Sequence, residues 1–239
     1  MPRRAEPAKL KPSVASIMSV ADFSREAEAH AAGHVPVAGV DEAGRGPLAG
    51  PVVVAAVVLD PGAVPHGLAD SKLLTAEQRE KLFAVILATS EVAVASAPPW
   101  RIDRDNIRAA TLWAMGRAVS ALPCRPMLAL VDGRDKPPGI TCQVEAIIDG
   151  DAKIASIAAA SIVAKVMRDR LMGRIGGACP GYLLEQHKGY ATAEHRALLV
   201  RLGPTRHHRR SFAPVRACLE DITPGGLPAV ADEIIGGMA

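Results

Sequence analysis

Acidic side chains stand where apolar segments of this 239-residue chain end. Asp41 closes the apolar segment Val35–Asp41 and is followed by Glu42, and Asp132 follows a second such segment. In open α/β sheets, functional sites form beyond the ends of strands. Successive strand residues point to opposite faces, so Asp41 and Glu42 can share an ion only if the chain bends, which Ala43–Gly44 would permit. These three carboxylates are our first candidates for a site that does chemistry.

A fourth acidic candidate lies in Ala152–Ile175, a segment with helical spacing. Ser161, Lys165 and Asp169 recur at i, i+4 and i+8, so they fall on one stripe of that helix. A lysine one turn before an aspartate is also the pattern of a surface ion pair, worth about 0.3–0.5 kcal/mol. Both interpretations of Asp169 stay open. We interpret the acidic turn Asp149–Asp151 as structural.

Several carboxylates gathered at one place would repel one another, and their pKa values would rise. Ligand sets made only of oxygen suit Mg²⁺ or Mn²⁺. Two such ions about 3.5–4 Å apart stabilise the attacking and leaving oxygens of a phosphoryl displacement. Four carboxylates carry about the charge that two divalent ions neutralise. This balance favours phosphodiester chemistry over acid–base work on a sugar.

Each acidic position also has an ordinary structural interpretation. Asp41 and Glu42 can be the solvated end of a strand, and Asp132–Gly133 is a common turn sequence. The spacing alone therefore does not decide between a catalytic cluster and a set of polar strand ends.

The loop after the first acidic pair contains Gly44, Arg45 and Gly46. Glycines let the backbone approach a nucleic acid closely, because no side chain intervenes. An arginine can bind a phosphate through two parallel hydrogen bonds. A plain tight loop is the alternative, and a single Gly–Arg–Gly sequence is weak evidence by itself.

Composition restricts the class of protein. Hydrophobic residues make up 49% of the chain, enough for a large core, and a net charge of +3 is compatible with a polyanionic partner. The four cysteines are scattered without a paired spacing, which argues against a zinc site or disulfides. No apolar run reaches the roughly 18 residues that a membrane span needs. We expect a soluble, cytoplasmic protein.

The hydrophobic pattern predicts an α/β fold with a sheet of about five strands and a small helical C-terminal part. The predicted strands are Val35–Asp41, Pro51–Leu59, Glu91–Ala97, Met127–Val131 and Cys142–Ile148. The predicted helices are Val20–Ala32, a segment from the Thr75 cap to Ala88, Asp103–Leu122, Ala152–Ile175, and a segment from the Thr192 cap to Leu202. We expect residues 1–34 to form a flexible N-terminal extension, 35–223 the domain, and 224–239 a frayed tail.

Taken together, these segments resemble the type 2 ribonuclease H family, in particular its bacterial ribonuclease HII branch. They follow the family's order and cover roughly Val35–Val215. The residues that carry the resemblance are Gly39–Pro51, Asp70–Lys72, Val131–Gly133, Ala159–Asp169, His187–Tyr190 and His208–Phe212.

The resemblance implies a ribonuclease H-like fold, a mixed sheet flanked by helices with a C-terminal helical segment. It implies that the acidic positions matching Asp41, Glu42, Asp132 and Asp169 hold the catalytic Mg²⁺ or Mn²⁺ ions. The loop of Gly44, Arg45 and Gly46 would then recognise the 2′-hydroxyl at a junction between ribonucleotide and deoxyribonucleotide.

A tyrosine of the family stacks on the following deoxyribose. Tyr190 is our candidate for that role, and the region around His207 is the competing one. The sequence departs from many bacterial members after Asp132–Gly133, where Arg134–Asp135 replaces an asparagine. The departure leaves the metal ligand intact but puts the outer contacts of that loop in doubt.

Basic residues near these motifs are candidates for phosphate contacts. They are Lys72, Lys165, Lys188 and the C-terminal run Arg206–Arg210, in which Arg209 is the residue we select. A solvated charged loop is the alternative for that run. Ser71 and Ser161 are interpreted as hydrogen-bonding supports, because no histidine–acid relay accompanies them.

The function that these observations favour is an endonuclease that cuts the RNA strand of RNA–DNA hybrids and cuts 5′ of ribonucleotides embedded in duplex DNA. We expect a monomer with no membrane partner. One alternative is a nuclease or strand-transfer enzyme of the same fold that acts on DNA. Another is a hybrid-binding module without catalysis. A duplex with one embedded ribonucleotide distinguishes the first alternative, and metal-dependent cleavage the second.

Overall fold

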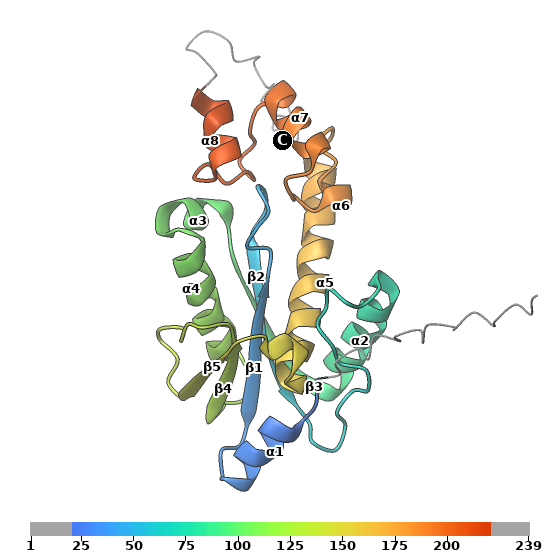
Figure 1. Ribbon diagram of the computed structural model, residues 1–239, viewed down its shortest axis with the longest axis vertical. Coiled ribbons are helices and arrows are strands. Elements are labelled where there is room, and N and C mark those ends of the chain that lie inside the picture. Colours follow the sequence, from blue (N-terminus) through green and yellow to red (C-terminus); the bar gives the residue numbers. More distant parts are fainter. Residues whose placement is uncertain (1–20, 221–239) are drawn as a thin grey trace, which may run out of the picture.

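One mixed β-sheet organises residues 21–220, the part of the chain that the computed structural model describes (Figure 1). The predicted tail 224–239 and the first part of the predicted N-terminal extension lie outside it. Within the described part the strands are β1 (Val37–Ala43), β2 (Val52–Leu59), β3 (Ser90–Ala97), β4 (Leu128–Asp132) and β5 (Gln143–Ile147).

The sheet has the order β3-β2-β1-β4-β5, with β1 in the centre. β2 pairs antiparallel with both β1 and β3, whereas β4 pairs parallel with β1 and with β5. The predicted mixed sheet of five strands is confirmed. Because β1, β4 and β5 run in the same direction, their carboxyl ends meet at one edge of the sheet.

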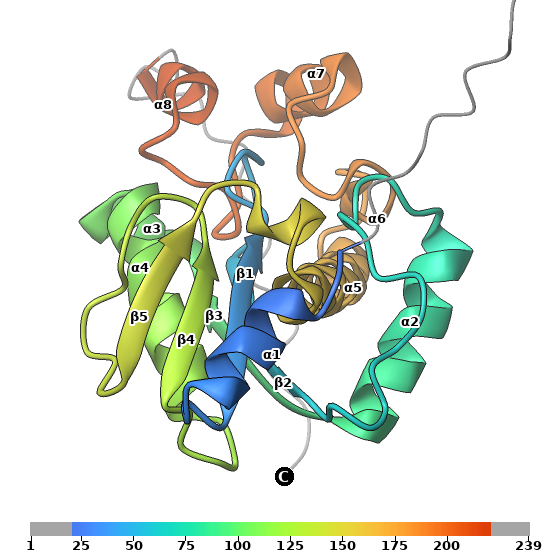
Figure 2. The ribbon, with the colours of Figure 1, turned by 60° about the horizontal axis from the view of Figure 1, so that its bottom comes forward.

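Strand β2 is buried on both of its faces, which explains its nearly continuous valine and alanine sequence. Ala55, Val57 and Leu59 pack toward helices α2 (Ala76–Thr89) and α5 (Ala155–Ala178). The intervening β2 residues pack toward α4 (Ile107–Ser120) on the other face. Figure 2 shows the sheet between these two layers of helices.

Helix α5 crosses the sheet close to β1. Its first half is rich in alanine and fully buried. Gly39 of β1 makes this approach possible, because a Cβ atom there would overlap with the backbone of Ser156. The central helix and strand are therefore fixed relative to each other by backbone-to-backbone contact, which gives a rigid base to whatever lies at their ends.

Two helices replace the single one predicted from Asp103, so that prediction was wrong. α3 (Pro99–Asp105) ends at Asn106, whose φ of 67° breaks the helix and whose side chain caps α4 by accepting from the Ala109 amide at 3.0 Å. Asp103 lies inside α3. Its carboxylate accepts hydrogen bonds from the backbone amides of Arg210 and Ser211, which ties the C-terminal segment to α3.

The N-terminal boundary also differs from the prediction. The helix predicted over Val20–Ala32 is present as α1 (Ser24–Ala31) and packs on the domain, so the packed part of the chain begins before residue 35. Buried Glu26 accepts a hydrogen bond from the Ser156 amide at 2.7 Å and so caps the first turn of α5. This contact joins residues 130 positions apart, which local sequence patterns do not show.

The C-terminal helices lie beyond the carboxyl end of β1, at the top of Figure 1. They are α6 (Leu184–His187), α7 (Ala193–Leu202) and α8 (Ala213–Glu220). The predicted Thr192 cap of α7 is confirmed, since its hydroxyl accepts from the His195 amide at 3.1 Å. No helix in residues 21–220 has the length and hydropathy needed to cross a membrane.

Candidate active site at the ends of the parallel strands

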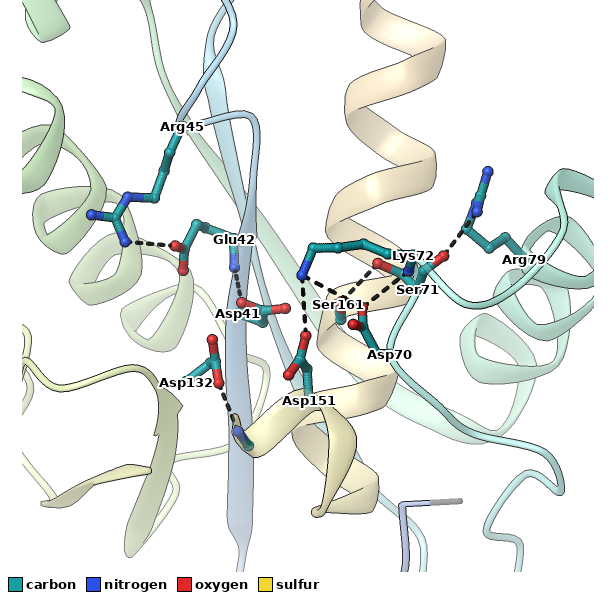
Figure 3. Close-up of polar contacts among 11 residues, drawn as sticks. Asp41, Glu42, Arg45, Asp70, Ser71, Lys72, Arg79, Asp132, Asp151 and Ser161 are labelled. Atoms are coloured by element: carbon teal, nitrogen blue, oxygen red, sulfur yellow. Dashed lines mark hydrogen bonds and ion pairs between the residues drawn. The ribbon is translucent and has the colours of Figure 1, made fainter. Parts of the chain in front are cut away.

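A pocket of about 290 Å³ opens where the carboxyl ends of β1 and β4 meet the start of α5. Ten of the residues predicted to form the site line it, and they come from segments far apart in the sequence (Figure 3). These ten are Asp41, Glu42, Gly44, Arg45, Gly46, Lys72, Asp132, Ser161, Lys165 and Tyr190. The remaining lining residues are Ala43, Ser71 and Asp151.

Asp41 lies at the bottom of the pocket, and only 4% of it is exposed. Its Oδ1 accepts from the Glu42 amide at 2.7 Å, and Ser161 donates to the same carboxylate. Burial raises the pKa of Asp41 well above its usual value, and the charges of Glu42 and Asp132 raise it further. The site therefore disfavours an ionised Asp41 unless positive charge is brought to it.

Glu42 leaves β1 on the face opposite to Asp41, because β1 continues in register with β2 as far as Ala43. The bend that we expected comes only after the pair, at Gly44 with its φ of 96°. Glu42 Oε1 accepts from Arg45 Nη1 at 3.1 Å, whereas Oε2 is buried without a hydrogen-bond partner among residues 21–220. Burial raises the pKa of Glu42 despite the neighbouring Arg45.

Asp132 and Asp151 face each other across the end of β4. Asp132 Oδ1 accepts from the Gly150 amide at 2.8 Å and holds the short 3₁₀ helix η1 (Gly150–Ala152). This turn brings Asp151 into the pocket, where burial and then the charges of Asp132 and Asp70 raise its pKa. Asp151, which we predicted to be structural, thus belongs to the carboxylate cluster. Its position just after β5 was the available signal, since β5 ends at the same edge.

Asp169 does not line the pocket. Its Oδ1 forms an ion pair with Lys165 Nζ at 2.7 Å, the ordinary interpretation left open by the spacing. Asp169 is eight residues beyond Ser161 on the same helix, so it lies about 12 Å further along the axis. The stripe Ser161–Lys165–Asp169 is real, but only its first two members reach the site.

The pocket suits hard divalent cations. Its acidic side chains offer only oxygen atoms as ligands. Glu42 Oε2 is buried without a hydrogen-bond partner among residues 21–220. Burial raises the pKa of Asp41, Glu42 and Asp151. As the side chains lie, no three Asp, Glu, His or Cys residues within 21–220 are close enough to hold one ion. Arg45 and Lys72 each pair with one of the carboxylates instead. An incoming cation would have to replace these pairs.

The loop of Gly44, Arg45 and Gly46 lines the pocket, and Figure 3 shows Arg45 above Glu42 and Asp41. Gly44 has positive φ, and a Cβ there would overlap with the Arg168 guanidinium. Gly46 has no atom within 4 Å of such a Cβ. The backbone amides of Arg45 and Gly46 have no hydrogen-bond partner in the described part of the chain. The loop therefore offers free donors on its open side.

The predicted phosphate contacts divide into two groups. Lys72 lines the pocket, with its Nζ 3.5 Å from both Asp70 and Asp151, and Lys165 lines it as well. Lys188 does not line it. Arg209 is completely buried and its guanidinium donates to backbone carbonyls, so it cannot contact a phosphate. That prediction was wrong, because a basic sequence run does not show which of its members point inward.

Tyr190 is on the open side of the pocket, with 44% of the residue exposed. Its carbonyl accepts from His195 Nδ1 at 2.8 Å, which fixes the main chain on which the ring is carried. His207, near the competing region, does not line the pocket. Of the two candidates Tyr190 is the one that lines the pocket, and its stacking role stays a prediction. The Oγ atoms of Ser71 and Ser161 are 2.9 Å apart and hydrogen-bonded. As predicted, the two serines act as hydrogen-bonding supports beside Asp41.

The loop after Asp132 makes its outer contacts within the chain. Asp135 accepts two hydrogen bonds from the Arg108 guanidinium on α4, at 2.6 and 2.9 Å. The departure at Arg134–Asp135 therefore leaves Asp132 in place at the end of β4.

Replacing Asp41 with Asn should stabilise the metal-free protein at neutral pH. Because the pKa of Asp41 is higher in the folded than in the unfolded chain, its contribution to stability is present at acidic pH and is lost as pH rises through the folded pKa. Asn keeps the acceptor for the Glu42 amide without the charge. We expect a gain on the order of 1–3 kcal/mol at pH 7, disappearing near pH 4. Thermal unfolding of both proteins in EDTA between about pH 4 and pH 7 measures this gain in stability. A less stable Asp41→Asn protein at pH 7 would contradict the electrostatic account.

Comparison with known proteins agrees with this geometry. A family model for ribonuclease HII matches residues 38–215, which contain every residue of the pocket. The chain belongs to the ribonuclease HII family. Ribonuclease HII of Xanthobacter autotrophicus is 65% identical over 195 residues, covering 82% of this chain and 78% of that protein. Ribonuclease HII of Azorhizobium caulinodans is 66% identical over 195 residues, covering 82% of this chain and 75% of that protein.

Solved structures support the same assignment. The crystal structure of ribonuclease H2 from Pyrococcus horikoshii OT3 matches with a TM-score of 0.68 and 29% identity, over 78% of this chain and 98% of that one. The ribonuclease HII in a PCNA complex from Archaeoglobus fulgidus matches with a TM-score of 0.64 and 28% identity, over 73% of this chain and 94% of that one. The predicted ribonuclease H-like fold is confirmed, and the chain is an enzyme, an endonuclease of the ribonuclease H type.

Proposed function

We propose that this member of the ribonuclease HII family hydrolyses the RNA strand of RNA–DNA hybrids and cuts 5′ of single ribonucleotides embedded in duplex DNA. The products are a 3′-hydroxyl and a 5′-phosphate. The observation that carries the proposal is the joint position of Asp41, Glu42, Asp132 and Asp151 in one pocket with a loop whose amides are free. We further propose that the enzyme works as a monomer in the cytoplasm.

The four carboxylates at the end of β1, at the end of β4 and in η1 would hold two Mg²⁺ or Mn²⁺ ions. Such ions neutralise charge on the phosphate and on the attacking and leaving oxygens. Asp41, with its raised pKa, gains most from that charge. Ser161 orients Asp41, and the Gly150 amide orients Asp132, so two of the carboxylates are held in place before a cation binds. A related ribonuclease HIII was crystallised with Mn²⁺.

Recognition of the substrate is assigned to the residues that line the pocket beside the carboxylates. The free amides of Arg45 and Gly46 can donate to a 2′-hydroxyl or phosphate, and the 2′-hydroxyl is the group that distinguishes RNA from DNA. Tyr190 offers a ring on which a sugar or base can stack. Lys72 is cationic in the pocket: burial opposes its charge, but Asp70 and Asp151 raise its pKa overall. It is suited to contact a phosphate oxygen once Asp151 binds a cation.

Product mapping tests the function. Two duplexes, one with an RNA stretch and one with a lone ribonucleotide, are incubated with the enzyme and Mg²⁺, Mn²⁺ or EDTA. We expect cleavage of both duplexes only with metal, and incision of the second duplex on the 5′ side of the ribonucleotide. An all-DNA duplex of the same sequence is the control. Cleavage of that control at the same rate would show a DNA nuclease instead, and tight binding to the hybrid without any cleavage would show a binding module.

A further inference from the structure

Arg209 is buried against the loop Gly44–Gly50, whose first three residues line the pocket. Its guanidinium donates to three backbone carbonyls of that loop: Nε to Gly50 at 3.0 Å, Nη1 to Arg45 at 2.7 Å and Nη2 to Gly44 at 2.5 Å. None of the residue is exposed. One planar group therefore fixes both ends of the loop at once, which a lysine or an amide side chain cannot do.

A second buried arginine holds the same loop from helix α5. Arg168 donates from Nε to the Pro51 carbonyl at 3.2 Å, and from Nη2 to the carbonyls of Ala49 and Lys188 at 3.4 and 3.0 Å. Its guanidinium lies 5.6 Å from the centre of the Tyr190 ring. The loop is thus held between the long helix and the C-terminal segment.

Neither guanidinium is paired with a carboxylate in the described residues. Burial lowers the pKa of both arginines, that of Arg209 to about 9. Two like charges without acidic partners are costly inside a protein. Within the described residues, the two guanidinium groups donate only to backbone carbonyls, those of the loop and that of Lys188. Burying the two arginines costs stability. That cost is explained if the two side chains are needed to fix the conformation of the loop.

The carbonyls turned inward leave the amides turned outward. In Gly44–Gly46, Arg209 donates hydrogen bonds to the carbonyls of Gly44 and Arg45. The amides of Arg45 and Gly46 have no hydrogen-bond partner in the described part of the chain. Such a run of free donors is a preformed site for an anionic or hydroxyl oxygen. Free donors held by a rigid frame need no reorganisation when a ligand binds.

We propose that Arg209 is a positioning residue for ribonucleotide discrimination: it holds the Gly44–Gly46 backbone so that the free amides of Arg45 and Gly46 face the 2′-hydroxyl and adjoining phosphate of the substrate. Arg168 supports the same loop from α5. This inference rests on the proposed function of the pocket. It assigns Arg209 a role without contact to the substrate, since its side chain is entirely buried.

The test compares binding of two duplexes of one sequence, one with a single ribonucleotide and one entirely of DNA, in EDTA so that no cleavage occurs. The ratio of the two dissociation constants measures discrimination. In Arg209→Gln we expect this ratio to fall on the order of tenfold, with kcat on a saturating RNA–DNA hybrid in Mg²⁺ changing by less than about threefold. Arg209→Lys keeps the charge and one donor group, so it should recover part of the ratio.

Two control variants separate positioning from other effects. Arg196→Gln removes one charge from the exposed surface of α7, which controls for electrostatics. Leu199→Ala weakens the buried contact between α7 and α8, which controls for stability of the C-terminal part. Both should keep the wild-type ratio. A lowered ratio in Leu199→Ala, at the same loss of melting temperature as Arg209→Gln, would overturn the proposal.

The remaining outcomes are also decisive. A folded Arg209→Gln with the wild-type ratio overturns the role of Arg209 and leaves the proposed function intact. Wild-type protein that binds both duplexes equally overturns the proposed discrimination and, with it, this inference. If Arg209→Gln does not fold, Arg209→Lys carries the test, and an unchanged ratio there overturns the proposal.

Discussion

Asp151→Asn should reduce cleavage by about 10³-fold or more, equivalent to about 4 kcal/mol of transition-state stabilisation, whereas Asp169→Asn should stay within about threefold of the wild type. Asp151 lines the pocket with Asp41, Glu42 and Asp132, and the charge of Asp132 contributes to its raised pKa. The Asp169 carboxylate is bound to Lys165 instead, in an ion pair expected to contribute about 0–1 kcal/mol.

Single-turnover cleavage of an RNA–DNA hybrid at saturating Mg²⁺ measures this pair of variants. They remove the same charge from residues 18 positions apart on neighbouring elements, so a loss of net charge affects them equally. Circular dichroism checks that each is folded. The reverse result, an active Asp151→Asn beside an inactive Asp169→Asn, would restore Asp169 to the site and remove Asp151 from it.

Gly44→Ala should destabilise the fold by roughly 2–4 kcal/mol, while Gly46→Ala should change its stability by less than about 0.5 kcal/mol. At Gly44 the backbone has φ of 96°, and a Cβ would overlap with Arg168, which cannot move without losing its bonds to the carbonyls of Pro51 and Lys188. At Gly46 the Cβ would meet open space and φ is not positive.

Urea unfolding of the two variants gives the comparison. Because the open space at Gly46 is where we place the substrate, Gly46→Ala should still raise KM for a duplex with a single ribonucleotide. The two glycines thus separate the two uses of the loop, one for packing and one for recognition. Equal destabilisation by both substitutions would mean that the loop is not supported by Arg168 in the way the structure indicates.

The rule that sites form beyond strand ends was sufficient to find Asp41 and Asp132. The same rule applies to β5, but the Asp–Gly–Asp sequence that follows it has the composition of an ordinary turn, so the sequence alone predicts a structural role for Asp151. Asp169, for which two interpretations stay open from the sequence, shows a different limit. Helical spacing shows which face a residue occupies, and it does not show how far along the helix the site extends.

The contacts that sequence reasoning could not supply are the long-range ones made by buried polar groups. Glu26 caps a helix through an amide 130 residues later, and Arg209 binds a loop about 160 residues earlier. In a sequence both look like surface charges, because composition and periodicity describe only local environments. Strands, most helices and the motifs were predictable because each depends on neighbouring residues.

The bonds from Arg209 to the loop between β1 and β2 join residues 159, 164 and 165 positions apart. Chains are synthesised from the N-terminus, and folding begins before synthesis ends. The loop therefore leaves the ribosome long before Arg209, and until then the carbonyls of Gly44, Arg45 and Gly50 lack the donor that binds them in the folded chain. A nascent chain can carry all four carboxylates of the pocket while the recognition loop beside them is still unformed. Completion of this enzyme is thus coupled to the arrival of its last buried arginine.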